Sequence, residues 1–310
     1  MTRGLAALAG ALAVLSLLVG RAGFGVTDTA ILWELRVPRT LLALAVGAGL
    51  GLSGAVLQGL LRNRLADPGL LGVTGGASLG AVLVFYYGLA ATLPVALPLG
   101  GLAGAGLAAA AILALASRTG TGAALLLAGI AVASLTGAAV AVALSFAPNP
   151  FALAEITIWL LGSLEDRGWN EVLLALPAVA AGIALLLGLG RRLDALTLGE
   201  ATAASLGVDV AGTVRRTAAG AALAVGATAA VAGSVGFVGL IAPNLVRGVA
   251  GERPGALLLP SMLTGAALVT AADIAVRIIP LQQELRLGVV TALIGAPLLL
   301  RLVVTRGGRP

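Results

Sequence analysis

The chain has 310 residues, 59% of them hydrophobic and 10% charged, and its formal net charge is +6. It contains no Cys and no His, which excludes disulfides, thiolate or imidazole metal sites, and Ser-His-Asp or Cys-His nucleophile systems within the chain. All 19 basic residues are Arg. Because a Walker ATP site requires a lysine, the chain cannot hold such a site itself.

This composition predicts a polytopic membrane protein. About 183 residues are apolar (59% of 310), and at about 20 residues for each span they supply about nine transmembrane helices. A net positive charge is also typical of nucleic-acid binding. Arginines scattered between apolar spans are more simply topology signals, so no nucleic-acid partner is expected.

Apolar runs separated by Gly, Pro and charged residues give ten candidate spans. These are residues 5–20, 40–61, 70–91, 95–116, 122–146, 171–189, 214–232, 235–246, 257–279 and 287–304. The first span follows Arg3 and has no clean small-x-small cleavage site after it, which favours an uncleaved helix over a signal peptide. Between the fifth and sixth spans, Phe151–Leu161 predicts an interfacial helix entered through the turn Pro148-Asn149-Pro150.

Arginine placement predicts the orientation of the chain in the membrane. With the N-terminus inside, thirteen of the 19 arginines fall on the cytoplasmic side and six on the outer side, which supports an even number of spans and two cytoplasmic termini. The aromatic residues agree, because they fall at the outer ends of spans, where amphipathic rings settle. They are Trp33, Tyr86, Tyr87, Trp159 and Trp169.

Three segments depart from the pattern of a lipid-facing helix. Residues 36–73 contain Gln58, a polar group at membrane depth that should face a partner helix or a water-filled path. The cytoplasmic loop of about residues 191–216 is long enough for two short helices, hinged at Gly199 and ending at Gly207. The third segment consists of residues 272–277 followed by residues 287–297.

The eighth candidate span is also unusual. Residues 232–247 are apolar and rich in glycine, but Pro243 interrupts them after too few residues to cross a membrane. An interrupted helix at membrane depth is tolerated where protein or a water-filled path surrounds it, which is typical of a transporter. An ordinary glycine-rich packing helix is the alternative interpretation.

These segments carry an ordered series of motifs. They are Arg-x-Pro-Arg, Gly-Ala-Val-Leu-Gln-Gly, Arg-Asn-x-Leu-Ala-Asp-Pro-Gly-Leu-Leu-Gly-Val, Leu-Gly-Glu, Gly-Phe-Val-Gly-Leu-Ile-Ala-Pro, Ala-Asp-x-x-x-Arg and Gly-Val-Val-Thr-Ala-Leu-Ile-Gly-Ala-Pro. From about Arg36 to Leu302 the chain resembles the iron-siderophore, haem and cobalamin uptake permeases, the membrane subunits of type II ABC importers.

The resemblance implies an all-α polytopic fold of about ten transmembrane helices, the type II ABC importer permease fold, over a single transmembrane domain of residues 1–310. It implies a second permease copy in a homodimer or heterodimer, two cytoplasmic ATPase subunits that hold ATP and Mg, and an extracytoplasmic substrate-binding protein. No cofactor or metal is expected on this chain. The implied location is the lipid bilayer of a bacterial cytoplasmic membrane.

The resemblance also assigns roles to three groups of residues. Coupling to the ATPase is assigned to Gly199, Glu200, Ser205, Leu206 and Gly207. Docking of the binding protein is assigned to Arg36, Arg39 and Arg277. The translocation path and its gate are assigned to Gln58, Asn63, Leu65, Thr121, Gly122, Pro243 and Asn244.

Each assignment has a structural alternative. The coupling loop can be a solvated loop with a capping glutamate, and the gate turn a plain helix end. Arg36 and Arg39 can anchor a span to lipid headgroups, while Arg277 pairs with Asp273 four residues earlier. The chain also departs from the family pattern, which has His at Asn244 and Pro at Arg64 and Arg286; Arg286 is expected to add an outward-facing charge.

The expected function is the permease subunit of an importer for a metal chelate, with ferric siderophore favoured, then haem or cobalamin. An ion-coupled secondary transporter is the alternative, but it should place an acidic residue in mid-membrane. The acidic residues considered for this role fall at predicted loop or span ends instead: Asp67, Asp194, Glu200, Glu252 and Asp273. An intramembrane enzyme is disfavoured because the chain lacks His, Cys and a buried acid pair.

Overall fold

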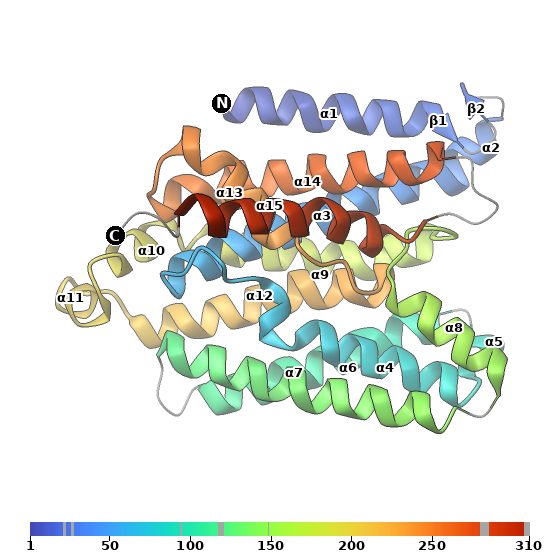
Figure 1. The fold of residues 1–310 in the computed structure, drawn as a ribbon, viewed down its shortest axis with the longest axis horizontal. Helices are drawn as coiled ribbons and strands as arrows, with labels where there is room; N and C mark the ends of the chain where they lie inside the picture. The colour runs from blue at the N-terminus through green and yellow to red at the C-terminus, as the bar shows by residue number, and fades with distance from the viewer. Residues whose placement is uncertain are drawn as a thin grey trace.

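The computed structural model describes residues 1–20, 23–25, 28–93, 95–116, 121–147, 149–279 and 285–306. Within them the chain forms a helical bundle with one short antiparallel pair of strands (Figure 1). Three arginines counted for the orientation, Arg21, Arg118 and Arg309, lie outside the described residues, as does Pro148 of the predicted turn.

The elements follow one another along the chain with short connections. They are α1 Thr2–Leu18, β1 Val19–Gly20, β2 Gly23–Phe24, α2 Thr29–Ile31, the π-helix η1 Leu32–Arg36, α3 Val37–Leu60, the 3-10 helix η2 Pro68–Leu71, α4 Val73–Tyr86, α5 Leu89–Thr92, α6 Ala96–Ala116, α7 Gly122–Ser145, α8 Pro150–Leu160, α9 Trp169–Leu187, α10 Gly190–Leu196, α11 Glu200–Ser205, α12 Val210–Ala232, α13 Val238–Ala250, α14 Pro254–Ile278 and α15 Leu287–Arg306.

A helix occupies each of the ten predicted spans, and α8 occupies the predicted interfacial segment. Among the described residues, five helical segments are long and apolar enough to cross a membrane: Thr29–Leu60, Ala96–Ala116, Gly122–Ser145, Trp169–Leu187 and Pro254–Ile278. Five more apolar helices are shorter, at 10–17 residues. The prediction of an all-α polytopic fold is confirmed.

Helix α3 is the centre of the bundle, and it packs against α9, α12, α13 and α14. Its contacts are close because glycines face one another across them. A Cβ atom added to Gly47 would collide with the backbone of Gly265 on α14, and one added to Gly54 would collide with the backbone of Gly239 on α13. Close approach of small residues is how helices associate where lipid removes the hydrophobic driving force.

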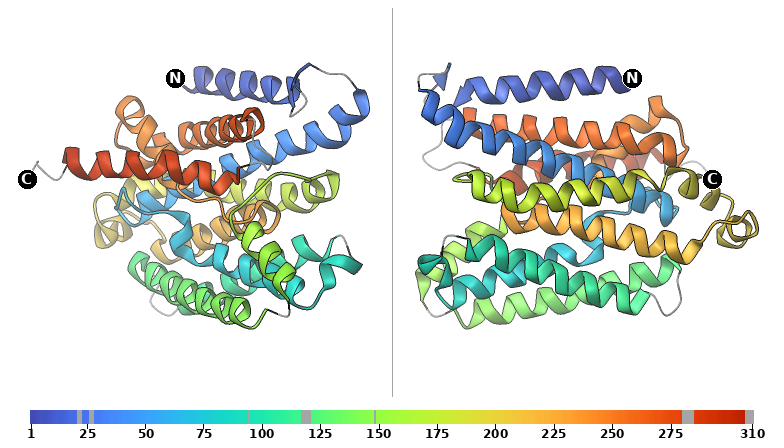
Figure 2. Two further views of the ribbon diagram at one scale, coloured as in Figure 1. Left: turned by 45° about the vertical axis from the view of Figure 1, so that its right-hand side comes forward. Right: turned by 180° about the vertical axis from the view of Figure 1, so that it is seen from behind.

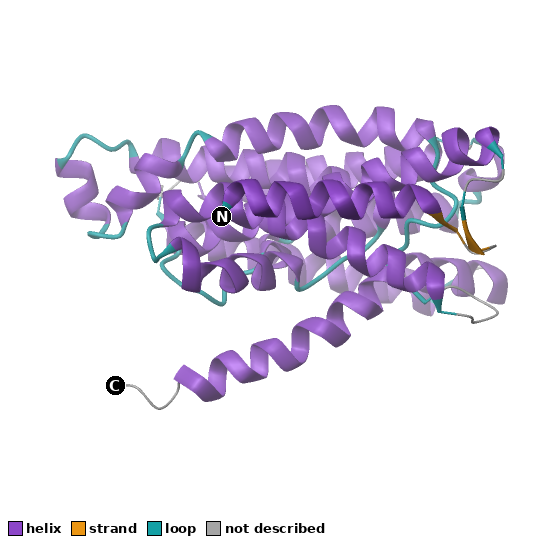
Figure 3. Cartoon of the chain, turned by 90° about the horizontal axis from the view of Figure 1, so that it is seen from above, coloured by secondary structure: helices purple, strands orange, loops and turns teal. Residues whose placement is uncertain are grey.

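The peripheral helices form two opposite edges of the bundle (Figure 2). At one edge α1 lies along α14, and at the other α4, α6 and α7 pack together. Figure 3 shows α15 diverging from the remaining helices toward its C-terminal end. Both the start of α1 and the end of α15 lie toward the end of the bundle that carries α10 and α11 (Figure 1). We call this the α11 end, and we call the opposite end, with β1 and β2, the hairpin end.

The predicted break at Pro243 is wrong. Helix α13 runs through Pro243, and the irregular backbone lies before it, between α12 and α13, where Gly233 has φ 70° and Phe237 has φ 65°. Proline removes the N–H that would bond the carbonyl four residues earlier. That carbonyl belongs to Gly239, and it accepts a hydrogen bond from Gln58 Nε2 at 3.4 Å instead. The side chain of a neighbouring helix therefore satisfies the freed backbone group.

The coupling loop is also shorter than predicted. Helix α12 begins at Val210, so Arg215 and Arg216 are helical rather than part of the loop. Asp209 starts this helix, because its Oδ1 accepts a hydrogen bond from the Gly212 N–H at 2.7 Å. The carboxylate thereby satisfies one of the free N–H groups of the first turn and extends α12 toward the α11 end.

Candidate functional site

Two short helices at the α11 end form the predicted coupling segment. Gly199 separates α10 from α11 with φ 100°, and Gly207 follows α11 with φ 85°. Both values lie in the left-handed region that glycine tolerates best. The predicted hinge and end of the two helices are confirmed. The side chains of Leu198 and Leu206 are 61% and 64% exposed, so both remain available to a partner, while Ser205 Oγ donates to the Thr202 carbonyl at 2.8 Å.

The structure joins this coupling segment to the predicted gate. Glu200 Oε1 accepts a hydrogen bond from the Gly122 N–H, the first residue of α7, at 3.3 Å. Thr121 caps the same helix, because its Oγ1 accepts from the Ala124 N–H at 3.2 Å. A carboxylate is favourable at a helix N-terminus, where N–H groups are free and the helix dipole is positive. This hydrogen bond connects α11 to the start of α7.

The turn after α3 holds the other predicted gate residues. Asn63 Oδ1 accepts from the Leu65 N–H at 2.9 Å, which fixes the turn, and the Leu65 side chain is 46% exposed. Asp67 begins η2 by accepting from the Gly69 N–H at 2.8 Å. Burial raises the pKa of the Asp67 carboxyl above its ordinary value, and the N–H groups of Gly69 and Leu240 oppose this increase.

Gln58 lies at the centre of a polar cluster that connects α3 to α13. It is 4% exposed, and its Oε1 accepts a hydrogen bond from Arg247 Nη2 at 2.7 Å. Its Nε2 donates to the carbonyls of Ala66 and Gly239, each at 3.4 Å. Gln58 was predicted to face a partner helix or a water-filled path, and it contacts the partner helix α13. Arg247 was not predicted as a site residue. The sequence did contain a signal, because Arg247 ends the apolar span that contains Pro243.

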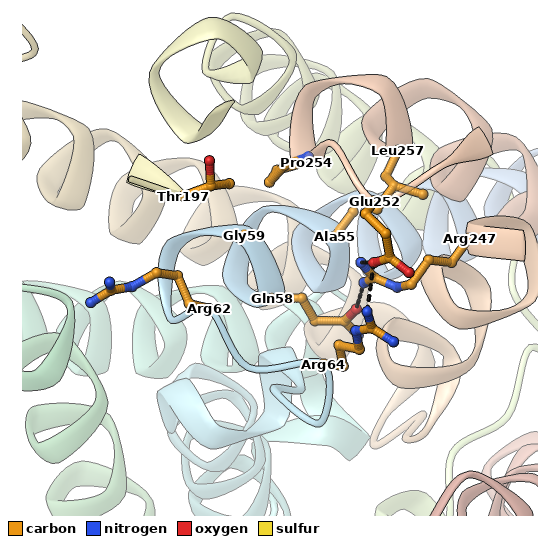
Figure 4. A pocket seen from close by; sticks show the side chains of 10 residues that line it. All are labelled: Ala55, Gln58, Gly59, Arg62, Arg64, Thr197, Arg247, Glu252, Pro254 and Leu257. Atoms are coloured by element: carbon orange, nitrogen blue, oxygen red, sulfur yellow. Dashed lines mark hydrogen bonds and ion pairs between the residues drawn. The ribbon is translucent and has the colours of Figure 1, made fainter. Parts of the chain in front are cut away.

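Beside this cluster lies a cavity of about 210 Å³ (Figure 4). Glu252 bridges two arginines at its edge, with its Oε2 2.8 Å from Arg64 Nη2 and 3.3 Å from Arg247 Nη1. Asn244 Nδ2 donates to the backbone carbonyl of Arg64 at 3.1 Å and to the carbonyl of Leu240 at 2.8 Å. Two of the departures from the family pattern, Arg64 and Asn244, are thus in direct contact.

The third departure, Arg286, is in an ion pair. Its Nη1 lies 3.0 Å from Glu165 Oε2, and the two side chains are 19% and 24% exposed. The expectation that this charge faces the outer side stays a prediction, and Glu165 in the loop before α9 pairs with it. The pair connects that loop to the start of α15.

The predicted docking arginines lie at the hairpin end, where two of them share one carboxylate. Arg39 Nη2 is 2.9 Å from Asp273 Oδ1, and Arg277 Nη2 is 2.6 Å from Asp273 Oδ2. Asp273 is 1% exposed and Arg277 is 6% exposed. Asp273 lies in the last two turns of α14, near the end of the predicted span, and it is covered by α1 and α3.

The same network extends into α1. Arg277 Nη1 donates to the carbonyls of Ser16 and Val19 at 2.9 and 3.0 Å, and Ser16 Oγ lies 2.7 Å from Thr40 Oγ1. Arg36 Nη1 donates to the carbonyls of Leu17 and Gly25, both at 2.8 Å. The alternative pairing of Arg277 with Asp273 is confirmed. Docking by these arginines stays a prediction, and Arg36, on the rim of the network, is its best-placed member.

The fold and these polar clusters define a multi-pass helical membrane protein with a protruding helical segment at one end. The FecCD transport family matches residues 5–305 of the chain. The cobalamin import system permease protein BtuC of Halobacterium salinarum is 40% identical over 289 residues, covering 91% of this chain and 76% of that protein. The Fe(3+) dicitrate transport system permease protein FecD of Escherichia coli is 40% identical over 276 residues, covering 88% and 85%.

A solved structure of a metal-chelate type ABC transporter in an inward-facing conformation has the same fold. The TM-score is 0.89 at 32% sequence identity, and the match covers 98% of each chain. The chain belongs to the FecCD transport family, and its relatives are transport permeases. The family resemblance read from the motifs is confirmed.

Proposed function

We propose that the chain is the permease subunit of an ABC importer that takes up a metal chelate. The observation that carries this proposal is the contact between Glu200 and Gly122. It links an exposed helical protrusion, suited to an ATPase partner, to the start of a membrane helix. Relatives named for cobalamin and Fe(3+) dicitrate transport support a chelate as cargo, and within that class we favour a ferric siderophore, followed by haem and cobalamin.

The proposed complex contains a second permease copy, two ATPase subunits that bind ATP and Mg, and a substrate-binding protein on the outer side. The α11 end is proposed to face the cytoplasm, which places both termini there. Gly199, Glu200, Leu206 and their neighbours then meet the ATPase. An ion-coupled secondary transporter receives no support from the buried carboxylate at the hairpin end, because Arg39 and Arg277 both pair with Asp273.

The cargo is tested most directly through the binding protein encoded with this permease. That protein should be purified without refolding, and the chelate it retains should be identified by mass spectrometry and by its metal content. A ferric siderophore is the expected ligand. Retention of haem or cobalamin would correct the cargo within the proposed class, whereas retention of a metal-free amino acid or sugar would contradict the class.

The predicted gate can be tested with cysteine crosslinking, since the chain has no native cysteine. Asn63→Cys and Gly122→Cys are expected to crosslink between two permease copies in one nucleotide state of the ATPase only. A side chain at Gly122 is tolerated, because a Cβ there would meet no atom closer than 3.5 Å. Gly137→Cys on α7, where a Cβ meets nothing within 4 Å, is the matched control and should not crosslink. Equal crosslinking in every nucleotide state would show that these positions do not form the gate of the pathway.

Docking of the binding protein can be tested at Arg36 without disturbing the buried pair of Arg277 and Asp273. Arg36→Gln is expected to slow association with the binding protein by about fivefold or less, since one exposed ion pair contributes about 0.2–1 kcal/mol. The effect should be largest at low salt, because charges outside an interface core act mainly on the association rate. Surface plasmon resonance at two salt concentrations measures it, with Arg36→Lys as the charge-preserving control. An unchanged rate at low salt would place docking elsewhere.

A further inference from the structure

We propose that the cavity at the α11 end binds one anionic group, a carboxylate or a phosphate. The cavity lies between the end of α3, the turn after it, α13 and the start of α14 (Figure 4). Its charged lining is Arg62, Arg64, Arg247 and Glu252. Three positive charges against one negative charge leave a net charge of +2 (3 − 1) around a space of about 210 Å³. Gln58 and Thr197 add polar groups to the same lining.

Arg247 provides the second observation. It is 7% exposed, and its Nη1 and Nη2 are bonded to Glu252 and Gln58. Its Nε is buried and has no hydrogen-bond partner within the described part of the chain. Buried donors of charged groups are normally paired, because an unpaired one loses its hydration without compensation. A guanidinium that lines the cavity thus keeps one hydrogen-bond donor unsatisfied.

A simple topology signal does not account for this arrangement. Arginines that orient a membrane protein act from loops or headgroup regions and do not need burial. Arg253, one residue after Glu252, has that character, because it is exposed and does not line the cavity. Arg247 instead lies inside the protein, where its guanidinium faces the polar groups of two other segments. Guanidinium groups in such sites form charge-assisted hydrogen bonds with carboxylates and phosphates.

The volume of the cavity limits the size of the group that it can bind. Pockets for whole drug-sized ligands have volumes of about 300–1,000 Å³, and this one has about 210 Å³. It therefore suits one acidic group rather than an entire metal chelate. Arg62 also lines the cavity. Its guanidinium points away from Arg64 and Arg247 (Figure 4) and lies beside Gly199, 3.9 Å from where a Cβ of that residue would stand. An anion here would therefore contact the turn after α3 next to the coupling segment.

Two sources have the required chemistry: an acidic group on the transported chelate, and the phosphate of an anionic lipid headgroup such as that of phosphatidylglycerol. Naming the chelate as a source rests on the proposed function. The site itself does not, because it can be measured on the permease alone. Loss of the anion site would leave the importer proposal standing, and failure of ATP-dependent transport would leave the anion site standing.

The test uses the full chain in phosphatidylcholine nanodiscs, with inorganic phosphate as the probe at constant ionic strength. Phosphate is expected to raise the unfolding temperature in a saturable manner, since a ligand that binds only the folded state stabilises it. Arg247→Gln should weaken the apparent affinity about tenfold or more, because it removes hydrogen bonds from a charged group. Arg64→Gln and Arg62→Gln, both at exposed positions, should weaken it as well, and they keep the test valid if Arg247→Gln does not fold.

Arg253→Gln is the matched control, and it should retain the full response to phosphate. Nanodiscs containing phosphatidylglycerol distinguish the sources. A phosphate response that disappears there assigns the site to a lipid headgroup, and a response that persists, and that citrate reproduces, assigns it to a soluble acid. The proposal is overturned if phosphate gives no saturable shift, or if Arg62→Gln, Arg64→Gln and Arg253→Gln all respond like the unmodified chain.

Discussion

Replacing Asp273 by Ala is expected to destabilise the protein by about 3–5 kcal/mol, the range measured when one partner of a buried ion pair is removed. Asp273 is 1% exposed and neutralises two arginines, Arg39 and Arg277. Without it, both guanidinium groups lose their carboxylate, and Arg277 remains buried beneath α1. The contact between α1 and α14 should loosen first, because Arg277 also bonds the carbonyls of Ser16 and Val19.

The measurement is the unfolding temperature of the purified permease, together with the protection of α1 from proteolysis. Asp273→Asn keeps the shape of the side chain but removes its charge, so it should also destabilise the protein. Glu34→Ala is the matched control, since Glu34 is an exposed acidic residue at the same end, and surface changes of this kind are usually within about 0.5 kcal/mol. An Asp273→Ala variant as stable as Glu34→Ala would show that the network does not hold the helices together.

Leu206→Asp is expected to abolish ATP-driven transport while the permease still folds and enters the membrane. The Leu206 side chain is 64% exposed in the isolated chain, so a charge there meets water and leaves the core unchanged. In the proposed complex it would lie against the ATPase, where loss of an anchoring side chain typically costs about 1–4 kcal/mol. Burial of an unpaired carboxylate in that interface would add to the loss.

Two measurements separate coupling from folding for this variant. The unfolding temperature of Leu206→Asp should match that of the unmodified permease, and its co-purification with the ATPase should fall. Leu206→Met, which keeps the apolar contact, is the control and should transport normally. Normal uptake and normal ATPase assembly in Leu206→Asp would place the coupling surface elsewhere and leave α11 as a solvated protrusion.

The spans were predictable from the sequence because burial in lipid is a local property of composition. A run of about 20 apolar residues is readable without knowing its neighbours, and helices occupy all ten predicted runs. Gly199 and Gly207 were also predictable, since the absence of a Cβ lets each adopt the positive φ that a sharp helix end requires. The two helices of the coupling segment followed from those two residues.

Pro243 was misread, and the burial of Asp273 was not predicted, because the environment of each residue comes from other helices. Pro243 was expected to interrupt its helix, but Gln58, 185 positions earlier (243 − 58), donates a hydrogen bond to the carbonyl that the proline leaves free. Asp273 was placed near a span end, and the structure adds that Arg39 and α1 cover it there. Each outcome depends on which helix packs against which, and hydropathy along one segment does not contain that information.

ATP-dependent uptake in proteoliposomes tests the central claim most directly. The permease should be reconstituted with its ATPase, with the binding protein and its retained chelate outside and ATP inside. We predict accumulation of the chelate that requires ATP and the binding protein, stops with vanadate, and is indifferent to proton or sodium gradients. Accumulation driven by an ion gradient without ATP would contradict the assignment of this chain as the permease of an ABC importer.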